Sequence, residues 1–126
     1  MPLYRKGGGG GGGEFDLPLF TYAGVLTVQA NALRSYAPRD CELTRVVLSL
    51  AEPSTGAPVI IDVNKNGSSV FATPPSIPAG EHLLVVDLPT PVPMTGLTDY
   101  LTVDVDQVGS TAAGTGLVAQ FTANPT

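Results

Sequence analysis

Apolar and polar residues alternate along much of this chain, and a period of two is typical of β-strands because successive side chains point to opposite faces. The clearest case lies in residues 58–68, which carry two alternating sets of side chains. One face has Val59, Ile61 and Val63, and the other has Ile60, Asp62 and Asn64. Asn66-Gly67 follows and predicts a type I′ turn, since Asn and Gly best tolerate positive φ. Residues 68–72 are expected to return as the second strand of a hairpin.

The same alternation predicts further strands at 20–28, 42–50, 81–88, 99–108 and 117–123. Gly24 predicts a bulge in the first of them. In 99–108, one face is apolar and the other polar. The inward set is Leu101, Val103 and Val105, and the outward set is Thr102, Asp104 and Asp106.

Three other stretches have distinct patterns. Residues 83–86 form a continuous apolar run, which predicts a strand buried on both faces. Residues 89–96 are rich in proline and predict a crossover between strands. Only residues 29–36 leave room for a helical turn, but the run is short and Pro38 follows, so we do not expect a helix there.

Glycine and proline together make up 27 of the 126 residues and are spread throughout, which leaves few windows for helices. Seven or eight short strands separated by turns about 8–12 residues apart are typical of an all-β sandwich. We therefore predict an antiparallel β-sandwich, with a jelly roll as the most natural specific arrangement.

The beginning of the chain differs in composition. Residues 7–13 are all glycine and follow a dibasic Arg5-Lys6, while 14–20 carry apolar side chains that could dock. Such a glycine run has maximal backbone freedom. It fits either a free tail or an arm that becomes ordered against neighbouring subunits. We divide the chain into a glycine-rich extended arm at 1–19 and a β-sandwich domain at 20–126.

The formal net charge is −5, and five of the six basic residues precede Val46, so the remainder is acidic. No basic stripe is present, which argues against nucleic-acid binding. No apolar run approaches the length of a membrane span, and no signal peptide is visible, so no membrane association is expected.

Few residues offer chemistry. Asp62-x-Asn64-x-Asn66-Gly67 matches the first half of a calcium loop, but the twelfth position, which needs a bidentate acid, is Thr73. We therefore interpret these residues as hairpin chemistry and not as a metal site.

Asp104 and Asp106 share a strand face, and Asp62 could lie near them. Paired carboxylates can bind a cation or act as acid and base, but we interpret these residues as a solvated outer face, where alternating acids discourage edge-to-edge aggregation. His82 and Cys41 are each the only residue of their type. Without partners they predict a surface histidine and a buried, inert thiol.

Three tyrosines, Tyr22, Tyr36 and Tyr100, would form a sugar-stacking platform if exposed together. We expect them instead in the core or at a subunit interface. The sequence therefore predicts no catalytic, cofactor-binding or metal-binding residue, no cofactor, and a protein that is not an enzyme.

Four segments carry a resemblance. They are residues 34–40, the hairpin 59–67 with Val70-Phe71 after it, Pro78-Ala79-Gly80, and 99–110. In this order they resemble a β-sandwich module of tailed-phage virion proteins, especially in phages of actinobacteria. The module occurs in minor tail proteins and at the ends of longer tail-fibre chains. The resemblance covers about residues 20–123 and excludes the arm.

The resemblance implies a structural virion component without catalysis, usually oligomeric. We therefore expect an accessory protein on the exterior of the particle, either a minor tail protein or a capsid decoration protein. Its partners would be tail or major capsid subunits, reached through the arm, and it would form a homo-oligomer, most naturally a trimer. The alternative is a module of a tail fibre or spike that binds host-surface carbohydrate.

Overall fold

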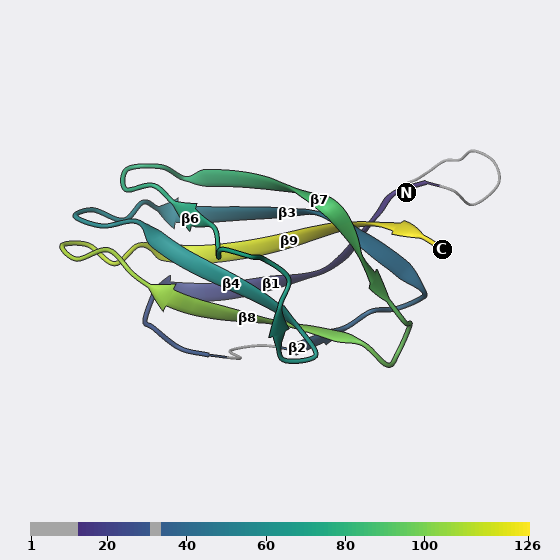
Figure 1. The fold of residues 1–126 in the computed structure, drawn as a ribbon. Coiled ribbons are helices and arrows are strands. Elements are labelled where there is room, and N and C mark those ends of the chain that lie inside the picture. Colours follow the sequence, from purple (N-terminus) through teal and green to yellow (C-terminus); the bar gives the residue numbers. More distant parts are fainter. Residues whose placement is uncertain (1–12, 31–33) are drawn as a thin grey trace.

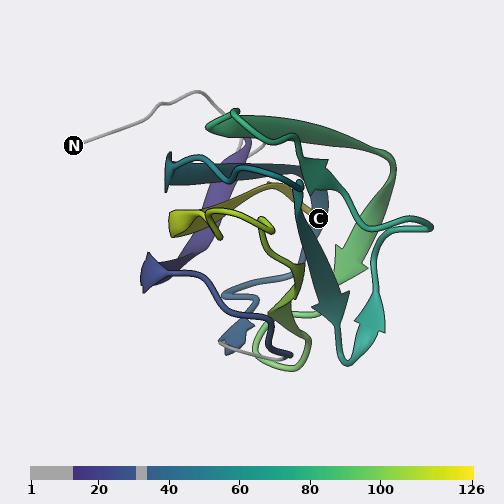
Figure 2. The ribbon, with the colours of Figure 1, turned by 90° about the vertical axis from the view of Figure 1, so that its left-hand side faces the viewer.

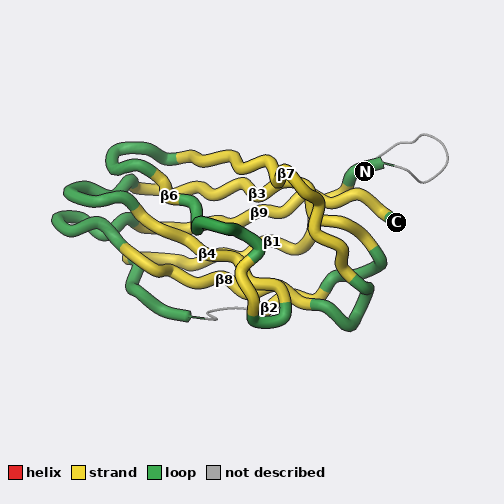
Figure 3. Tube along the Cα trace, viewed as in Figure 1, coloured by secondary structure: helices red, strands yellow, loops and turns green. Residues whose placement is uncertain are grey.

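The computed structural model describes residues 13–30 and 34–126, and these form nine β-strands (Figure 1). The strands are β1 Phe15–Val25, β2 Arg34–Tyr36, β3 Cys41–Glu52, β4 Val59–Lys65, β5 Ser68–Ser69, β6 Ser76–Ile77, β7 Leu83–Met94, β8 Tyr100–Gln107 and β9 Thr115–Pro125. Strands run along the length of the molecule, and the connecting loops gather mainly at its two ends (Figure 3). No helix that could span a membrane occurs in the described part of the chain.

The strands form two antiparallel sheets. Sheet A has the order β1-β9-β3-β7, and sheet B has the order β2-β8-β4-β5, with β6 also paired to β4. The pairs β1–β9, β2–β8, β3–β7 and β4–β6 are nested, as if one long hairpin had been wound around the core. This nesting is the topology of a jelly roll. The predicted all-β sandwich is confirmed.

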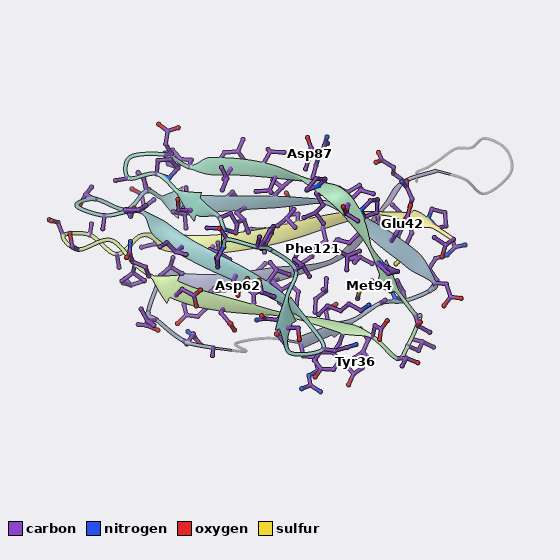
Figure 4. The ribbon with its side chains drawn as sticks, in the orientation of Figure 1. Tyr36, Glu42, Asp62, Asp87, Met94 and Phe121 are labelled. Carbon is purple, nitrogen blue, oxygen red and sulfur yellow. The ribbon has the colours of Figure 1, made fainter. Side chains whose placement is uncertain are left out.

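The core lies between the sheets and is built from alternating residues of both (Figure 2). It includes Val46, Leu48, Ile61, Val63, Leu101, Val105 and Phe121. Figure 4 shows Phe121 between the layers, where its ring meets Phe20 edge-on at 5.4 Å. Burial of each such side chain contributes roughly 1.5–3 kcal/mol, so the alternation itself fixes which face of each strand turns inward.

The predicted hairpin is present, with a shorter second strand. Asn66 and Gly67 both have positive φ, 51° and 89°, as a type I′ turn requires. The returning strand β5 has only two residues, Ser68–Ser69, and the chain then leaves β4 and pairs with it again as β6.

Two expectations for β7 were wrong. Leu83 and Val85 are 55% and 48% exposed, although the apolar run predicted burial on both faces. The predicted crossover at 89–96 is mostly strand, since β7 continues to Met94. Leu83 and Val85 lie on the outer face of sheet A, which is open to solvent in a two-layer sandwich. The prolines are tolerated because β7 is an edge strand of sheet A, so one side of its backbone needs no partner.

The sandwich begins earlier than expected. Strand β1 starts at Phe15, which pairs with Ala123 of β9, and Leu17 is buried. Residues 15–19, assigned from the sequence to the arm, are therefore part of sheet A. Residues 1–12 lie outside the described part. The predicted irregularity at Gly24 is confirmed by a register shift between Tyr22 and Val25.

The described residues of the stretch 29–36 take part in β-pairing and form no helix. Gln29 makes a bridge to Val105, and β2 pairs with β8 in the register Ser35 to Leu101. The helical-turn interpretation also covered residues 31–33, which lie outside the described residues.

Candidate interaction surfaces

The outer face of sheet B carries the acidic residues singled out in the sequence. Asp62 of β4 is directly opposite Asp104 of β8, so the two carboxylates share one face, as expected. Each has a hydrogen-bond donor beside it. Ser69 donates to Asp62 at 2.6 Å, and Asn64 donates to Asp104 at 2.9 Å.

Through these bonds, the side chains of the calcium-like pattern are directed to different partners and not to one common point. Asp62 accepts from Ser69, Asn64 turns to Asp104, and Asn66 turns to Asp99. In the described part of the chain, no group of three acids, histidines or cysteines is arranged to hold a metal ion. Turn and sheet contacts account for the pattern.

Asp106 extends the acidic row by one strand period. Partial burial raises the pKa of Asp106, and the negative charges of Asp62 and Asp104 raise it further. The row therefore repels anions and other acidic surfaces. Thr102, which was expected to be exposed on the outward face of β8, is almost completely buried.

Two of the three tyrosines meet, and the third lies elsewhere. Tyr36 and Tyr100 have ring centroids 5.4 Å apart, on the neighbouring strands β2 and β8. Arg34 covers the Tyr100 ring at 4.0 Å and donates to the Tyr36 hydroxyl at 3.3 Å. Figure 4 shows Tyr36 pointing away from the sandwich. Tyr22, on β1, contacts Thr27 instead.

His82 and Cys41 lie where the sequence analysis expected them, at the surface and in the core. His82 is exposed, and its Nδ1 lies 2.9 Å from the Leu50 carbonyl oxygen. Cys41 is 1% exposed in the core, and burial raises the pKa of its thiol.

The outer face of sheet A carries an apolar patch that the sequence pattern did not indicate. We call it the sheet A patch, and it consists of Leu83, Val85, Val47 and Val118. Val85 pairs with Val47, and Ser49 pairs with both Leu83 and Val118, so the patch crosses three strands. Beside it, Arg45 and Asp87 form a 2.6 Å ion pair. Leu83 and Val85 are exposed, and Val47 and Val118 are half-buried. Apolar side chains gathered on an outer sheet face are typical of interaction sites.

Comparisons with known proteins give a structural likeness. Neither a protein-family model nor a curated protein sequence matches this chain. A chain in the structure of the cyanophage Pam1 capsid asymmetric unit superposes with a TM-score of 0.55 at 18% identity, covering 100% of this chain and 94% of that chain. This chain shares its fold with a phage capsid chain.

A second solved structure is less similar. The core of Drosophila NLP, described for its pentamer formation and histone binding, gives a TM-score of 0.42 at 16% identity. The alignment covers 91% of this chain and 95% of that chain. At this TM-score the match supports no conclusion about the present protein.

Proposed function

We propose that this protein is a structural component of a phage particle, an accessory protein on its exterior and not an enzyme. The observation that carries the proposal is the jelly roll shared over the whole chain with a chain of the cyanophage Pam1 capsid asymmetric unit. Jelly rolls host many functions, including viral capsid domains, so the fold supports this role without specifying it.

The extent of the match favours a capsid decoration protein over a minor tail protein. Because the alignment covers 94% of the capsid chain, that chain consists of little more than the same sandwich. A single sandwich can therefore serve as a separate capsid component. The resemblance of the hairpin and of residues 99–110 to tail modules keeps the minor tail protein as the second placement.

The arrangement of titratable groups supports a role without catalysis. Asp62 and Asp104 are held by sheet-face hydrogen bonds, His82 is at a loop near Leu50, and Cys41 is in the core. The two carboxylates face each other, but His82 is bonded to the Leu50 carbonyl and Cys41 is buried in the core, so neither supplies a base or nucleophile beside them.

We also propose that the protein self-associates, with the sheet A patch of one copy packing against a second copy of the chain. The protein is acidic, so two copies repel each other across the carboxylate row of sheet B. On sheet A the Arg45–Asp87 pair is already neutralised, and the apolar patch beside it can be buried without leaving a charge unpaired. We expect a symmetric oligomer, and the trimer stays a prediction that these contacts do not decide.

Carbohydrate binding is the second candidate function. Its supporting observation is the cluster of Tyr36, Tyr100 and Arg34, in which Tyr36 is 45% exposed. Because Arg34 covers one face of Tyr100, Tyr36 provides the main open ring surface. A glycan array comparing the protein with Tyr36→Ala tests this function, and equal signals from both would reject it.

The proposed structural role is tested by incorporation. Particles are produced from the virus that encodes this chain with the gene deleted, purified, and mixed with the purified full chain. We expect the protein to sediment with the particles and to saturate at a defined number of copies. A protein that stays in the supernatant, and is also missing from wild-type particles, would reject the proposal.

A further inference from the structure

The turn between β7 and β8, residues 95–99, is held from several sides. The Gly96 amide donates to Asp40 Oδ1 at 2.8 Å, and the Leu97 amide donates to the Ala37 carbonyl at 2.7 Å. The Thr95 amide donates to Asp99 Oδ2 at 2.7 Å. The backbone of this turn is therefore fixed against the β2–β3 loop.

Gly96 shows how closely the two segments approach. A Cβ at this position would lie 2.7 Å from both the C and Cα atoms of Arg39. Only a glycine fits against the Arg39 backbone without moving it, so the turn rests directly on the β2–β3 loop.

At the tip of this turn, Leu97 has a conformation unusual for its type. Its φ is 59°, and its side chain is 77% exposed. The other described residues with positive φ are all glycine or asparagine. They are Gly24, Gly56, Asn66, Gly67, Gly80, Gly114 and Gly116. A left-handed conformation costs a residue with a Cβ roughly 1–2 kcal/mol, and Leu97 recovers none of it by burying its side chain.

This combination indicates a use for the side chain outside the domain. Glycine or asparagine would form the same turn with less strain, and an exposed leucine adds nothing to the core. A strained backbone conformation persists only where surrounding contacts hold it, and such residues are concentrated at binding and functional sites. Here the backbone hydrogen bonds of Gly96, Leu97 and Thr95 hold the turn in this conformation.

Leu97 also projects from the end of the sandwich at which the arm enters. The Arg39 guanidinium lies 5.7 Å from the Phe15 ring at the start of β1, and the Gly96 amide bonds to the adjacent Asp40. The twelve residues before Gly13 therefore join the domain beside the loop that supports Leu97. A partner that engages this arm is positioned to contact Leu97 as well.

We propose that Leu97 is a preorganised anchor that inserts into an apolar pocket on the particle subunit to which the protein attaches. The inference rests on the proposed structural role and adds which end of the sandwich faces the particle. The turn holds the leucine in its bound conformation beforehand, so little conformational entropy is lost on docking. A single well-placed apolar side chain can dominate an interface.

The test uses the full chain, the variants Leu97→Asn and Leu97→Gly, and gene-deleted particles as the binding probe. The control is Val28→Asn, which removes another exposed aliphatic side chain, 62% exposed, away from this turn. We expect both Leu97 variants to bind the particles about tenfold more weakly or worse, and Val28→Asn to bind like the wild type. The melting temperatures of the Leu97 variants should be equal to or above that of the wild type, because the strain is relieved.

The outcomes separate the two proposals. Wild-type binding by both Leu97 variants would overturn the anchor and leave the structural role intact. A wild-type chain that does not bind the particles and is also missing from wild-type particles would overturn both. Native mass spectrometry of the same variants completes the test. Loss of the oligomer in Leu97→Asn would place the pocket on a second copy, which contradicts the partner assigned here, whereas an unchanged oligomer supports it.

Discussion

Asn66 Nδ2 donates a 2.8 Å hydrogen bond to Asp99 Oδ1, and this bond ties the β4–β5 turn to the β7–β8 turn that presents Leu97. Asp99 also accepts from the Thr95 amide, and the Lys65 ammonium lies 3.7 Å away. The hydrogen bond from Asn66 lowers the pKa of Asp99 most, followed by that from Thr95. The two turns therefore depend on one ionised carboxyl group.

The first prediction concerns the pH dependence of stability. Because the pKa of Asp99 is below its ordinary 3.8 in the folded protein, its contribution is present above that value and is lost as the pH falls through the lower folded pKa. Thermal unfolding of the wild type and Asp99→Asn should show a difference in melting temperature near pH 6 that shrinks as the pH falls below 3.8. A gap that stays constant over this range would contradict the role of the charge.

A pair of glycine variants tests the close packing of the β7–β8 turn. Gly96→Ala places a methyl group against the Arg39 backbone and should cost about 3 kcal/mol. Gly80→Ala meets only the strain of φ +85°, with no atom within 4 Å, and should cost about 1 kcal/mol. Urea unfolding measures both free energies, and a Gly80→Ala cost equal to or larger than that of Gly96→Ala would refute the packing argument.

Two truncations test where the folded domain begins. Removal of residues 1–12 should leave the free energy of unfolding within about 0.5 kcal/mol of the full chain. Removal of residues 1–19 also deletes Leu17, which is 3% exposed, and the Phe15 pairing with β9. This deletion should cost about 3 kcal/mol or more. If both truncated chains were equally stable, the first part of β1 would not belong to the domain.

Another prediction tests self-association through the sheet A patch. Val85→Lys puts an uncompensated charge into the patch and should dissociate the oligomer in native mass spectrometry. Its melting temperature as a monomer should change little, because Val85 is 48% exposed. Thr90→Lys, at an exposed position elsewhere on β7, is the matched control and should keep the oligomer. Loss of the oligomer in the control alone would contradict the assigned surface.

The sequence predicted best where local chemistry and burial agree. The Asn66-Gly67 turn was recognised because few residues tolerate positive φ, and it has the expected geometry. The inward set of β8, Leu101, Val103 and Val105, was recognised because alternation follows directly from the strand period.

The errors occurred where the position of a strand in the sandwich decides which side chains are buried and whether proline is tolerated. The apolar run containing Leu83 and Val85 resembles a doubly buried strand, but in the two-layer sandwich one face of β7 is open to solvent. The prolines in β7 depend on the strand order, because an edge strand accepts them and a central strand does not.

The candidate anchor had no sequence signal. Leu97 follows Gly96 in an ordinary turn sequence, and the turn is held by Ala37 and Asp40, about 60 residues earlier in the chain. Local propensity favours glycine or asparagine at such a position, so no rule based on neighbouring residues selects a leucine there.

The central claim, that the protein is a structural part of the particle, is tested most directly by quantitative mass spectrometry of gradient-purified particles. The reference is the copy number of the major capsid protein in the same sample. We expect a fixed ratio of this chain to the capsid protein that persists through repeated purification. A chain that is abundant in the infected lysate but absent from the purified particles would contradict it.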